Sequence, residues 1–505
     1  MSPIIDPVDR LKSWLSKREI VPEFSLRKID IRELRKIVHK SLKPSRSHGA
    51  DFIDSYSLKL AFPLIEDSIL HLVNLSIGQQ SYADEWKFQL VLPLFKKDDA
   101  LDGKNYRPVS HIIEIGKIVE NVIHSQVYNH FTDNKLFHEN HHGFLKNHST
   151  ATALIQMYDL WISASEDKEL SAALLLDLSA AFDIVDHEIF FKKLRVYNFS
   201  DETVLWFKSY LENRLQKVQV QTKFSDTKVL GDYGVPQGSV LGPLIFIIFC
   251  NDFPACSVEG KSILYADDNT INVHSDNIHQ LKAKIQREAD RSTEWVNDNR
   301  MVCSGSKTKL LLLGTAQLRR NLLIGVNFAI KVCDNIVKES QSERLLGLIV
   351  NNQLTWSDYL NGEKWRENNN FVGLIPQLSQ RVGLLSRVAH FMPRSKLNIF
   401  CNGLFYSKLL YCLEVFSNVW CKNDMDEESR RYVAFTKQDI RKLQVLQNKI
   451  MRLKSGLPFE SGTKELTEST GDLSVHQLVA YSTLKTVHRI IISKQPEYLS
   501  TKLKL

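Results

Sequence analysis

Two adjacent carboxylates, Asp267 and Asp268, end the apolar run 263–266, and an alternating segment, 271–273, follows them. This pattern predicts a β-hairpin with both acids at its tip. Because like charges side by side repel each other, the pair is either a solvated turn or part of a site for a divalent metal ion. The metal site needs a third carboxylate from elsewhere in the chain.

Asp177 is the candidate for that third carboxylate, at the end of the nearly continuous apolar run 171–176. Such a run is typical of a strand covered on both faces, and Ser179 is expected to cap a short helical segment that carries Phe182. An acid in this place can also be a plain cap. Two strand-ending acids together are stronger evidence for a metal site than either alone. Two metal ions about 3.5–4 Å apart, held by carboxylates, can activate a 3′-hydroxyl and stabilise departing pyrophosphate. Hard oxygen ligands suit Mg²⁺.

A glycine-rich stretch, 231–239, lies between these acids and contains Gln237 and Gly238. Glycines allow close approach of the backbone to a ligand, and the Gln237 amide offers both a donor and an acceptor. The alternative is a Gly/Pro turn before a core helix, since the apolar run 240–249 predicts a buried helix with Pro243 near its start. The stretch has no Walker-type lysine and is therefore not a P-loop.

With their flanking residues, these three elements resemble successive polymerase motifs of reverse transcriptases of the non-LTR (LINE-type) retrotransposon family. The resemblance covers roughly residues 40 to 460. It rests on the segments 176–183, 234–243 and 265–268, with further matches at 92–97, 105–110, 142–150, 306–309, 345–348 and 354–356. The sequence departs from the family pattern at Phe52, Asn269 and Ser304.

The resemblance implies a catalytic and metal-binding set of Asp177, Asp267 and Asp268, with the first two as direct ligands of the ions. It implies that Phe182 stacks under the incoming sugar and excludes a 2′-hydroxyl. The remaining implied contacts are with the nucleotide (Arg107, Lys96, Lys97, Gln237, Gly238, Lys307) and, in a primer-grip hairpin, with the primer end (Leu346, Gly347). A planar guanidinium such as that of Arg107 suits phosphate oxygens.

Each role has a plainer alternative. Phe182 is also the kind of aromatic residue found in a core, and Arg107 could pair with a surface acid. The lysines at 96–97 precede two aspartates and could form a solvated charge run. The histidines at 138–142 lie in a polar segment and are interpreted as structural or as contacts to backbone phosphates.

The implied cofactors are two Mg²⁺ ions, with Mn²⁺ as the alternative. The implied partners are an RNA template, a DNA primer and deoxynucleoside triphosphates, with no membrane. An endonuclease, usual in long proteins of this family, is expected to be absent from this chain and supplied elsewhere. The expected location is intracellular, with the nucleus implied by the resemblance and the cytoplasm as the alternative.

Composition is ordinary for a globular protein, at 43% hydrophobic and 24% charged residues. The net charge of +7 is uneven: residues 371–505 hold 20 Lys or Arg and 11 Asp or Glu, a balance of +9, which leaves −2 for the rest. Basic charge of this kind suits a protein that follows phosphate backbones. Seven cysteines without CxxC spacing are read as reduced thiols, and no apolar run is expected to span a membrane.

The patterning predicts an α+β fold, and the resemblance implies a right-hand polymerase whose palm has an antiparallel sheet packed on helices. Five segments are expected: a helical N-terminal extension (1–40), fingers (41–170), the catalytic palm (171–316), a palm–thumb connection with the primer-grip-like hairpin (317–366), and a helical thumb with a basic C-terminal extension (367–505).

Three functions follow from different readings of these residues. The first is an RNA-directed DNA polymerase. The second is a catalytically inactive, retrotransposon-derived remnant that binds RNA. The third is an interaction protein that reuses the fold. All three acids are retained, which favours the first.

Overall fold

The structure, a computed structural model, describes residues 6–18, 20–96, 99–323, 327–362, 372–417 and 436–503. The chain forms two compact units, and each is built from separate stretches of sequence. The first unit contains residues 1–144, 177–258 and 290–304, and the second contains 145–176, 259–289 and 305–505. The predicted division into five consecutive segments stays a prediction.

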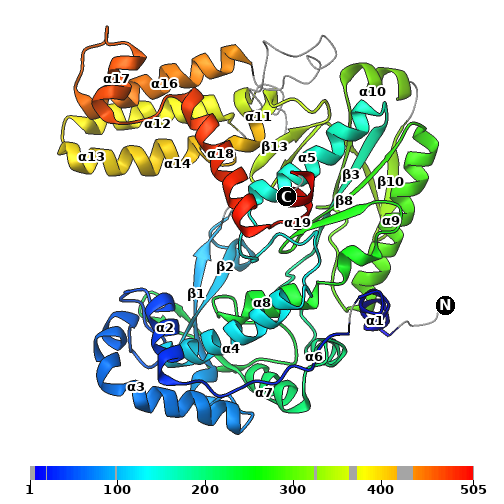
Figure 1. Cartoon of the computed structure of the whole chain (residues 1–505), viewed down its shortest axis with the longest axis vertical. Coiled ribbons are helices and arrows are strands. Elements are labelled where there is room, and N and C mark those ends of the chain that lie inside the picture. The colour runs from blue at the N-terminus through cyan, green and yellow to red at the C-terminus, as the bar shows by residue number, and fades with distance from the viewer. Residues whose placement is uncertain are drawn as a thin grey trace. The chain divides into compact units, whose positions relative to one another are not determined.

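Helices make up most of the first unit (Figure 1). Several begin at a side chain that accepts a hydrogen bond from a backbone N–H of the first turn, as Asp186 does from Ile189 at 3.0 Å. The helices are α1 (Asp9–Leu15), α2 (Ile31–Ser41), α3 (Ser55–Gly78), α4 (Glu114–Asp133), α6 (His187–Val196), α7 (Asp201–Leu211) and α8 (Leu241–Phe249), with the 3-10 turns Asp84–Lys87, Gly103–Asn105 and Phe253–Cys256.

A small mixed sheet completes the first unit. Its strands are β1 (Phe88–Phe95), β2 (Tyr106–Ile112), β4 (Leu215–Val220), β5 (Lys223–Phe224) and β6 (Lys228–Val229), in the order β2-β1-β4-β5 with β6 also paired to β4. β1 and β2 form an antiparallel hairpin, whereas β1 and β4 are parallel. More than a hundred residues separate β1 from β4, which leaves ample chain for the crossover that a parallel pair requires.

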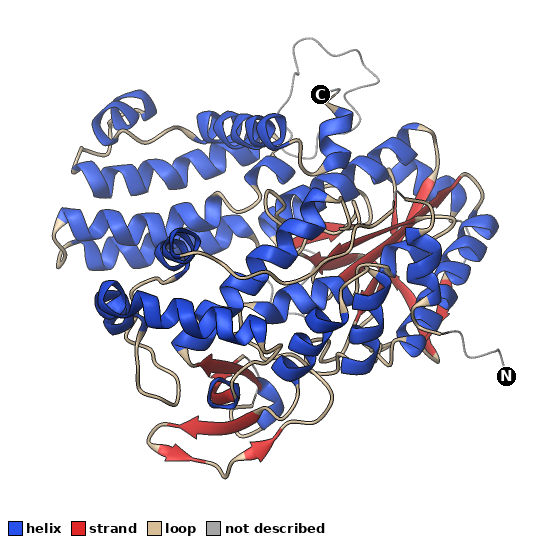
Figure 2. Cartoon of the chain, turned by 60° about the horizontal axis from the view of Figure 1, so that its bottom comes forward, coloured by secondary structure: helices blue, strands red, loops and turns tan. Residues whose placement is uncertain are grey.

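A six-stranded sheet forms the centre of the second unit (Figure 2). Its order is β10-β11-β9-β3-β8-β7, from the strands β3 (Leu170–Asp177), β7 (Lys261–Tyr265), β8 (Asp268–Ser275), β9 (Lys309–Leu313), β10 (Ala329–Val332) and β11 (Asn335–Ser340). β9 and β3 are antiparallel, but β11 and β9 are parallel. The expected antiparallel sheet is thus wrong in this detail, because α10 (Ala316–Leu322) and β10 provide a crossover between β9 and β11.

Two long helices pack on this sheet. The Trp161 indole N–H of α5 (Thr150–Glu166) donates to the Asn272 side-chain oxygen of β8 at 2.9 Å. α9 (Ile278–Asp298) buries Leu281, Ile285 and Ala289 on one face, as its spacing predicts.

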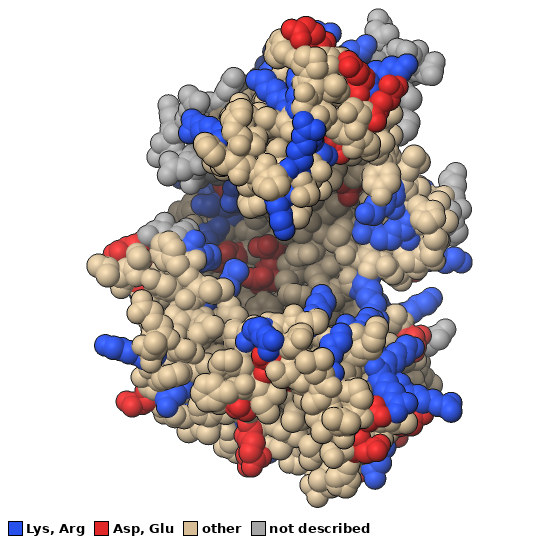
Figure 3. All heavy atoms as spheres, turned by 90° about the vertical axis from the view of Figure 1, so that its left-hand side faces the viewer, with Lys and Arg blue, Asp and Glu red and all other residues tan. Residues whose placement is uncertain are grey.

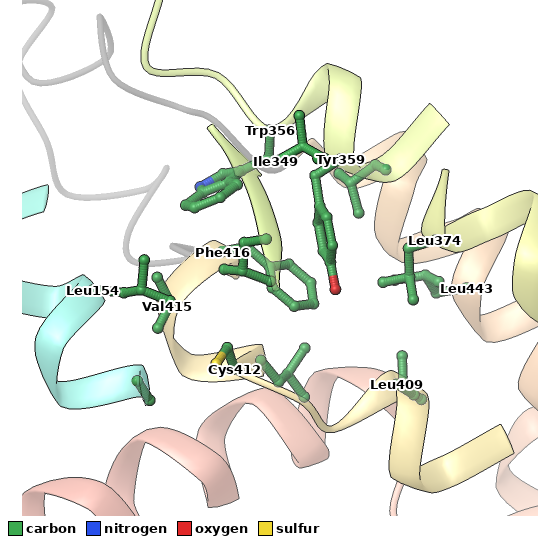
Figure 4. Close-up of a cluster of buried hydrophobic side chains, with 14 of the residues drawn as sticks. Leu154, Ile349, Trp356, Tyr359, Leu374, Leu409, Cys412, Val415, Phe416 and Leu443 are labelled. Atoms are coloured by element: carbon green, nitrogen blue, oxygen red, sulfur yellow. The ribbon is translucent and has the colours of Figure 1, made fainter. Parts of the chain in front are cut away.

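The C-terminal part of the second unit is helical after the hairpin β12 (Ser342–Leu345) and β13 (Leu348–Asn351). Its helices are α11 (Ser357–Asn361), α12 (Leu374–Ala389), α13 (Arg394–Cys401), the π-helical turn Asn402–Tyr406, α14 (Ser407–Leu409), α15 (Leu413–Phe416), α16 (Lys437–Ser455), α17 (Thr463–Thr470), α18 (Val475–Ser493) and α19 (Glu497–Lys502). Figure 4 shows the core they share with the hairpin, where Trp356, Tyr359 and Phe416 pack together among aliphatic side chains.

Several sequence expectations are confirmed here: the buried strand that ends in Asp177, the hairpin with Asp267 and Asp268 at its tip, and the buried helix after Ser239. The short helix expected after Ser179 is wrong. Residues 179–183 form turns instead, and Ala180 has a φ of 49°, a left-handed conformation that no helix accommodates.

Two helical stretches are long and apolar enough to cross a membrane by length and composition, Ser55–Gly78 and Arg394–Phe416. The expectation that no apolar run spans a membrane stays a prediction. Both stretches contribute to a core, since Val73 and Phe405 are completely buried. Core helices of soluble proteins meet the same length and composition criteria, so these two are weak indicators of a membrane.

One histidine of the 138–142 group makes stability sensitive to acid. The His138 ring stacks on Trp14, with centroids 5.5 Å apart, and its Nδ1 accepts from the Asn140 N–H at 3.2 Å. Burial, assisted by the positive charge of Arg18, lowers the pKa of His138 to about 4. The unfolded chain, with a histidine pKa near 6.5, binds more protons between these values, so stability is full above about pH 6.5 and falls as the pH falls towards 4.

We expect His138→Gln to remove about 2–3 kcal/mol of this acid sensitivity, the equivalent of a pKa shift of this size. Urea unfolding of the wild type and of His138→Gln at pH 7.5 and pH 4.5 gives the free energy of unfolding that each protein loses between the two pH values. The wild type should lose more. Equal losses in both proteins would contradict the prediction.

Candidate active site

The hairpin tip in the second unit presents two exposed carboxylates. Tyr265 of β7 lies opposite Asp268 of β8, so Ala266 and Asp267 form the two-residue turn between them. Ala266 has a φ of 57°, one of the left-handed positions that tight hairpin turns require. Burial of Ile263 and its neighbours fixes the strands. The sequence therefore predicted both the hairpin and the position of the acids within it.

The strand next to β8 in the sheet is β3, which ends at Asp177. Glu169, just before β3, forms an ion pair with His274, near the end of β8. The start of β3 thus lies beside the end of β8, and the two strands are antiparallel. It follows that the last residues of β3 and the first residues of β8 share one edge of the sheet. Asp177 is half-buried there.

Asp177 and Asp267 each offer carboxylate oxygens, the kind of ligand that suits Mg²⁺. In the described part of the chain, no group of three or more His, Cys, Asp or Glu side chains is placed so that it could hold a metal ion. Mg²⁺ seldom uses an all-protein cage, because it keeps several waters and binds through one or two carboxylates and substrate phosphates. Asp177 and Asp267 have the oxygen donors for that kind of binding.

The glycine-rich loop before α8 belongs to the first unit and is held tightly. The Ser110 N–H of β2 donates to the Gln237 carbonyl at 2.7 Å, and the Gln237 side-chain amide donates to Asp183 at 2.8 Å. Gly238 has a φ of 123°, and a Cβ there would lie 2.4 Å from the Ser110 carbonyl oxygen. Only glycine fits this position without a shift of the Ser110 backbone.

Phe182 is half-buried and lies against the same helix. Its ring stacks on Phe246 of α8, with centroids 4.3 Å apart and planes at 20°, and its edge meets Phe144 at 6.2 Å. The Phe182 carbonyl accepts from the Val235 N–H at 2.8 Å. The ring is therefore part of a core stack and also has an accessible side, so both interpretations of its role remain compatible with its position.

The cationic residues lie on two different parts of the chain. Arg107 is exposed on β2 opposite Leu94, and exposed Lys96 follows β1, where its N–H donates to the Asn105 carbonyl at 2.8 Å. The β1–β2 hairpin thus brings these two together. Lys97 lies outside the described residues, and Lys307 is an exposed residue of the second unit, before β9.

The predicted primer-grip residues form the turn of the β12–β13 hairpin. Leu346 and Gly347 have φ values of 46° and 87°, as a two-residue turn of this type requires. The Tyr411 hydroxyl donates to the Leu346 carbonyl at 2.7 Å, and a Cβ on Gly347 would lie 3.0 Å from that hydroxyl. The hairpin is confirmed, and its role in holding a primer stays a prediction.

Sequence reasoning missed a buried polar group behind the glycine-rich loop. Glu120 on α4 is completely buried, Arg214 is nearly so, and the Tyr82 hydroxyl donates to Glu120 at 3.3 Å. Burial raises the pKa of Glu120, and the charge of Arg214 is the main influence that opposes this rise. An acid within the apolar stretch 118–123 was the available signal, because such a residue rarely faces a core without partners.

A pocket of about 350 Å³ opens beside Gln237 in the first unit. Its lining includes Gln89, Asp183, His187 and Arg214. The His187 Nε2 lies 2.7 Å from the Gly234 carbonyl, and burial lowers the pKa of this ring.

Comparison with known proteins gives a consistent set of similarities. Residues 95–367 match the family model described as reverse transcriptase (RNA-dependent DNA polymerase). The chain is 24% identical over 460 residues to the RNA-directed DNA polymerase from mobile element jockey of Drosophila melanogaster, which is 89% of this chain and 46% of that protein. It is 25% identical over 436 residues to the probable RNA-directed DNA polymerase from transposon BS of Drosophila melanogaster, which is 83% of this chain and 44% of that protein. It is 26% identical over 420 residues to the probable RNA-directed DNA polymerase from transposon X-element of the same species, which is 82% of this chain and 42% of that protein. The chain thus spans less than half the length of these relatives.

Proposed function

Because the chain belongs to the reverse transcriptase family, whose model matches residues 95–367, we propose that it is an RNA-directed DNA polymerase of a non-LTR retrotransposon. It would extend a primer 3′-hydroxyl with deoxynucleotides on an RNA template. The observation that supports the proposal is the place of the acids in their elements, with Asp177 ending the buried strand β3 and Asp267 and Asp268 exposed at the tip of the β7–β8 hairpin. Its nuclear location stays a prediction.

The proposed chemistry assigns a task to each polar residue. Asp177 and Asp267 would bind two Mg²⁺ ions, and Asp268 would add negative charge beside them. When bound, the ions would activate the 3′-hydroxyl and stabilise charge on the departing pyrophosphate. Arg107 and Lys96 would hold the triphosphate on the β1–β2 hairpin, where the guanidinium offers paired N–H donors to phosphate oxygens.

The two units supply the surfaces that a right-hand polymerase needs. We assign the β1–β2 hairpin and α4 to the fingers, the six-stranded sheet to the palm, and α12 to α18 to the thumb. On the face drawn in Figure 3, Lys and Arg are spread with Asp and Glu among them rather than gathered in one patch.

Primer extension tests the proposal. The full chain, an RNA template with an annealed DNA primer, deoxynucleotides and Mg²⁺ should give extended product, and EDTA should abolish it while added Mg²⁺ or Mn²⁺ restores it. Measurable binding of the duplex without product would support the catalytically inactive RNA-binding remnant instead. If the chain neither extends the primer nor binds the duplex, the third hypothesis remains, an interaction protein that reuses the fold.

We expect Phe182→Ala to raise the use of ribonucleotides relative to deoxynucleotides by about 10- to 100-fold, the range for removing a steric contact from a binding pocket. The measurement is the ratio of kcat/KM for a matched pair of nucleotides. Phe182→Tyr is the control, because it keeps the bulk of the ring and should keep the discrimination. An unchanged ratio in Phe182→Ala would assign the residue to the core stack with Phe246 alone.

A further inference from the structure

Glu120 is a buried acid that accepts hydrogen bonds from the backbone at the end of the glycine-rich loop and from the Tyr82 hydroxyl. It lies within α4, surrounded by buried residues such as Val119 and Ile123. One carboxylate oxygen accepts from the Val240 N–H at 2.7 Å and the Leu241 N–H at 3.1 Å, and the other accepts from the Tyr82 hydroxyl. A buried carboxylate persists in a fold only with such partners.

These backbone donors are the first two of α8. Val240 is the N-cap residue of that helix and has no polar side chain of its own to cap it. Glu120 takes over this task from another helix, and its negative charge also complements the positive end of the helix dipole. Because Val240 comes directly after the 237–239 segment, Glu120 fixes the point where the glycine-rich loop ends.

The other anchors of the loop act at its beginning and middle. The Gly234 N–H donates to the Val185 carbonyl at 2.8 Å, and the Gln237 carbonyl accepts from the Ser110 N–H. The Ser239 hydroxyl donates to the Pro236 carbonyl and accepts from the Gly242 N–H, and Tyr210 also interacts with it. Glu120 is therefore the side chain from outside the loop that accepts from the Val240 and Leu241 backbone N–H groups where the loop ends.

Arg214 supports the anchor. Its guanidinium lies 4.9 Å from the Tyr210 ring centroid and donates to the Tyr210 carbonyl at 2.9 Å, all within the first unit. A buried positive charge near Glu120 favours the carboxylate form, which can accept hydrogen bonds at both oxygens.

We propose that Glu120 is a positioning residue for nucleotide binding, which holds the N-terminus of α8 so that Gln237 and Gly238 keep one conformation. This inference rests on the proposed function. It concerns a side chain that itself touches no nucleotide, so its effect is expected in the KM for deoxynucleotides and in the order of the loop, and far less in kcat.

Glu120→Gln tests the proposal, because it keeps the size of the side chain and removes its charge. We expect the KM for deoxynucleotides to rise about tenfold, with kcat within a few-fold of the wild type, and the amides of Val240 and Leu241 to exchange hydrogen faster. Tyr82→Phe, which leaves the carboxylate in place and removes one donor, should shift the KM and the exchange in the same direction but less. If Glu120→Gln does not fold, Tyr82→Phe alone tests the proposal.

Glu114→Gln is the matched control. Glu114 is also a buried acid of α4, but it pairs with Lys117 at 2.7 Å and not with the loop. We expect it to leave both the KM and the loop exchange unchanged. An unchanged KM and exchange in Glu120→Gln, or an equal rise in Glu114→Gln, would overturn the proposal. If no variant extends a primer, wild type included, the proposed function fails, and the exchange measurement still decides whether Glu120 holds the loop.

Discussion

Asp177→Asn and Asp267→Asn are each expected to reduce primer extension by about a thousandfold or more. Each substitution keeps the shape of the side chain and removes the negative charge that would hold a divalent cation, and metal-assisted transfer depends on that charge. Single-nucleotide extension in excess enzyme measures the rate directly. Thermal melting should stay close to that of the wild type, because Asp267 is exposed and Asp177 is only half-buried at a strand end.

Asp268→Asn and Asp276→Asn complete this series. Asp268 is expected to show a smaller loss than Asp267, in keeping with its supporting role. Asp276 is an exposed acid just past the other end of β8, and its substitution should leave extension unchanged. Wild-type rates in Asp177→Asn or Asp267→Asn would falsify the assignment of these carboxylates as metal ligands.

Lys193→Met is expected to cost about 3–5 kcal/mol of stability, the usual result of leaving one buried charge without its partner. Lys193 and Asp252 are both completely buried, and their side chains meet at 2.7 Å. The Lys193 ammonium also donates to the Phe249 carbonyl at 2.6 Å, at the end of α8, and the Trp295 indole N–H donates to Asp252 at 3.2 Å. Urea unfolding followed by circular dichroism measures the loss.

A double variant distinguishes the effect of an unpaired buried charge from the effect of altered packing. Lys193→Met with Asp252→Leu removes both charges, and we expect it to recover much of the lost stability, because a buried pair replaced by apolar side chains is often nearly neutral. Lys208→Met is the control, since Lys208 is exposed and lies 3.7 Å from Glu212, so the change should be within about 1 kcal/mol. Equal stability in Lys193→Met and Lys208→Met would show that the buried pair adds nothing.

The candidate acids could be found from the sequence because each ends an element with a strong pattern. The run before Asp177 is uninterrupted apolar sequence, and the residues around Asp267 alternate, so strand type and chain position followed directly. Strand order could not be read in this way. Periodicity identifies which face of a strand is buried, but the adjacency of β3 and β8 joins residues about ninety positions apart.

Contacts between buried polar side chains could not be predicted from the sequence either. Lys193 lies in a helix whose sequence is equally compatible with a solvated face, and only the fold brings Asp252 to it. Glu120 likewise gains its partners from Tyr82 and α8. The turn at 179–183 failed as a helix prediction because capping residues indicate where a helix can begin, whereas the left-handed backbone at Ala180 depends on tertiary contacts.

The interleaved composition of the two units has a consequence for synthesis. The first unit requires residues 290–304, and the second requires 145–176 from the middle of the first. A ribosome therefore cannot release a finished N-terminal unit before about residue 304 has emerged, by which time β3, β7 and β8 are also outside the exit tunnel. Any fragment that holds all of the first unit also carries residues 145–176 and 259–289 of the second, so no single cut of the gene would separate the two units.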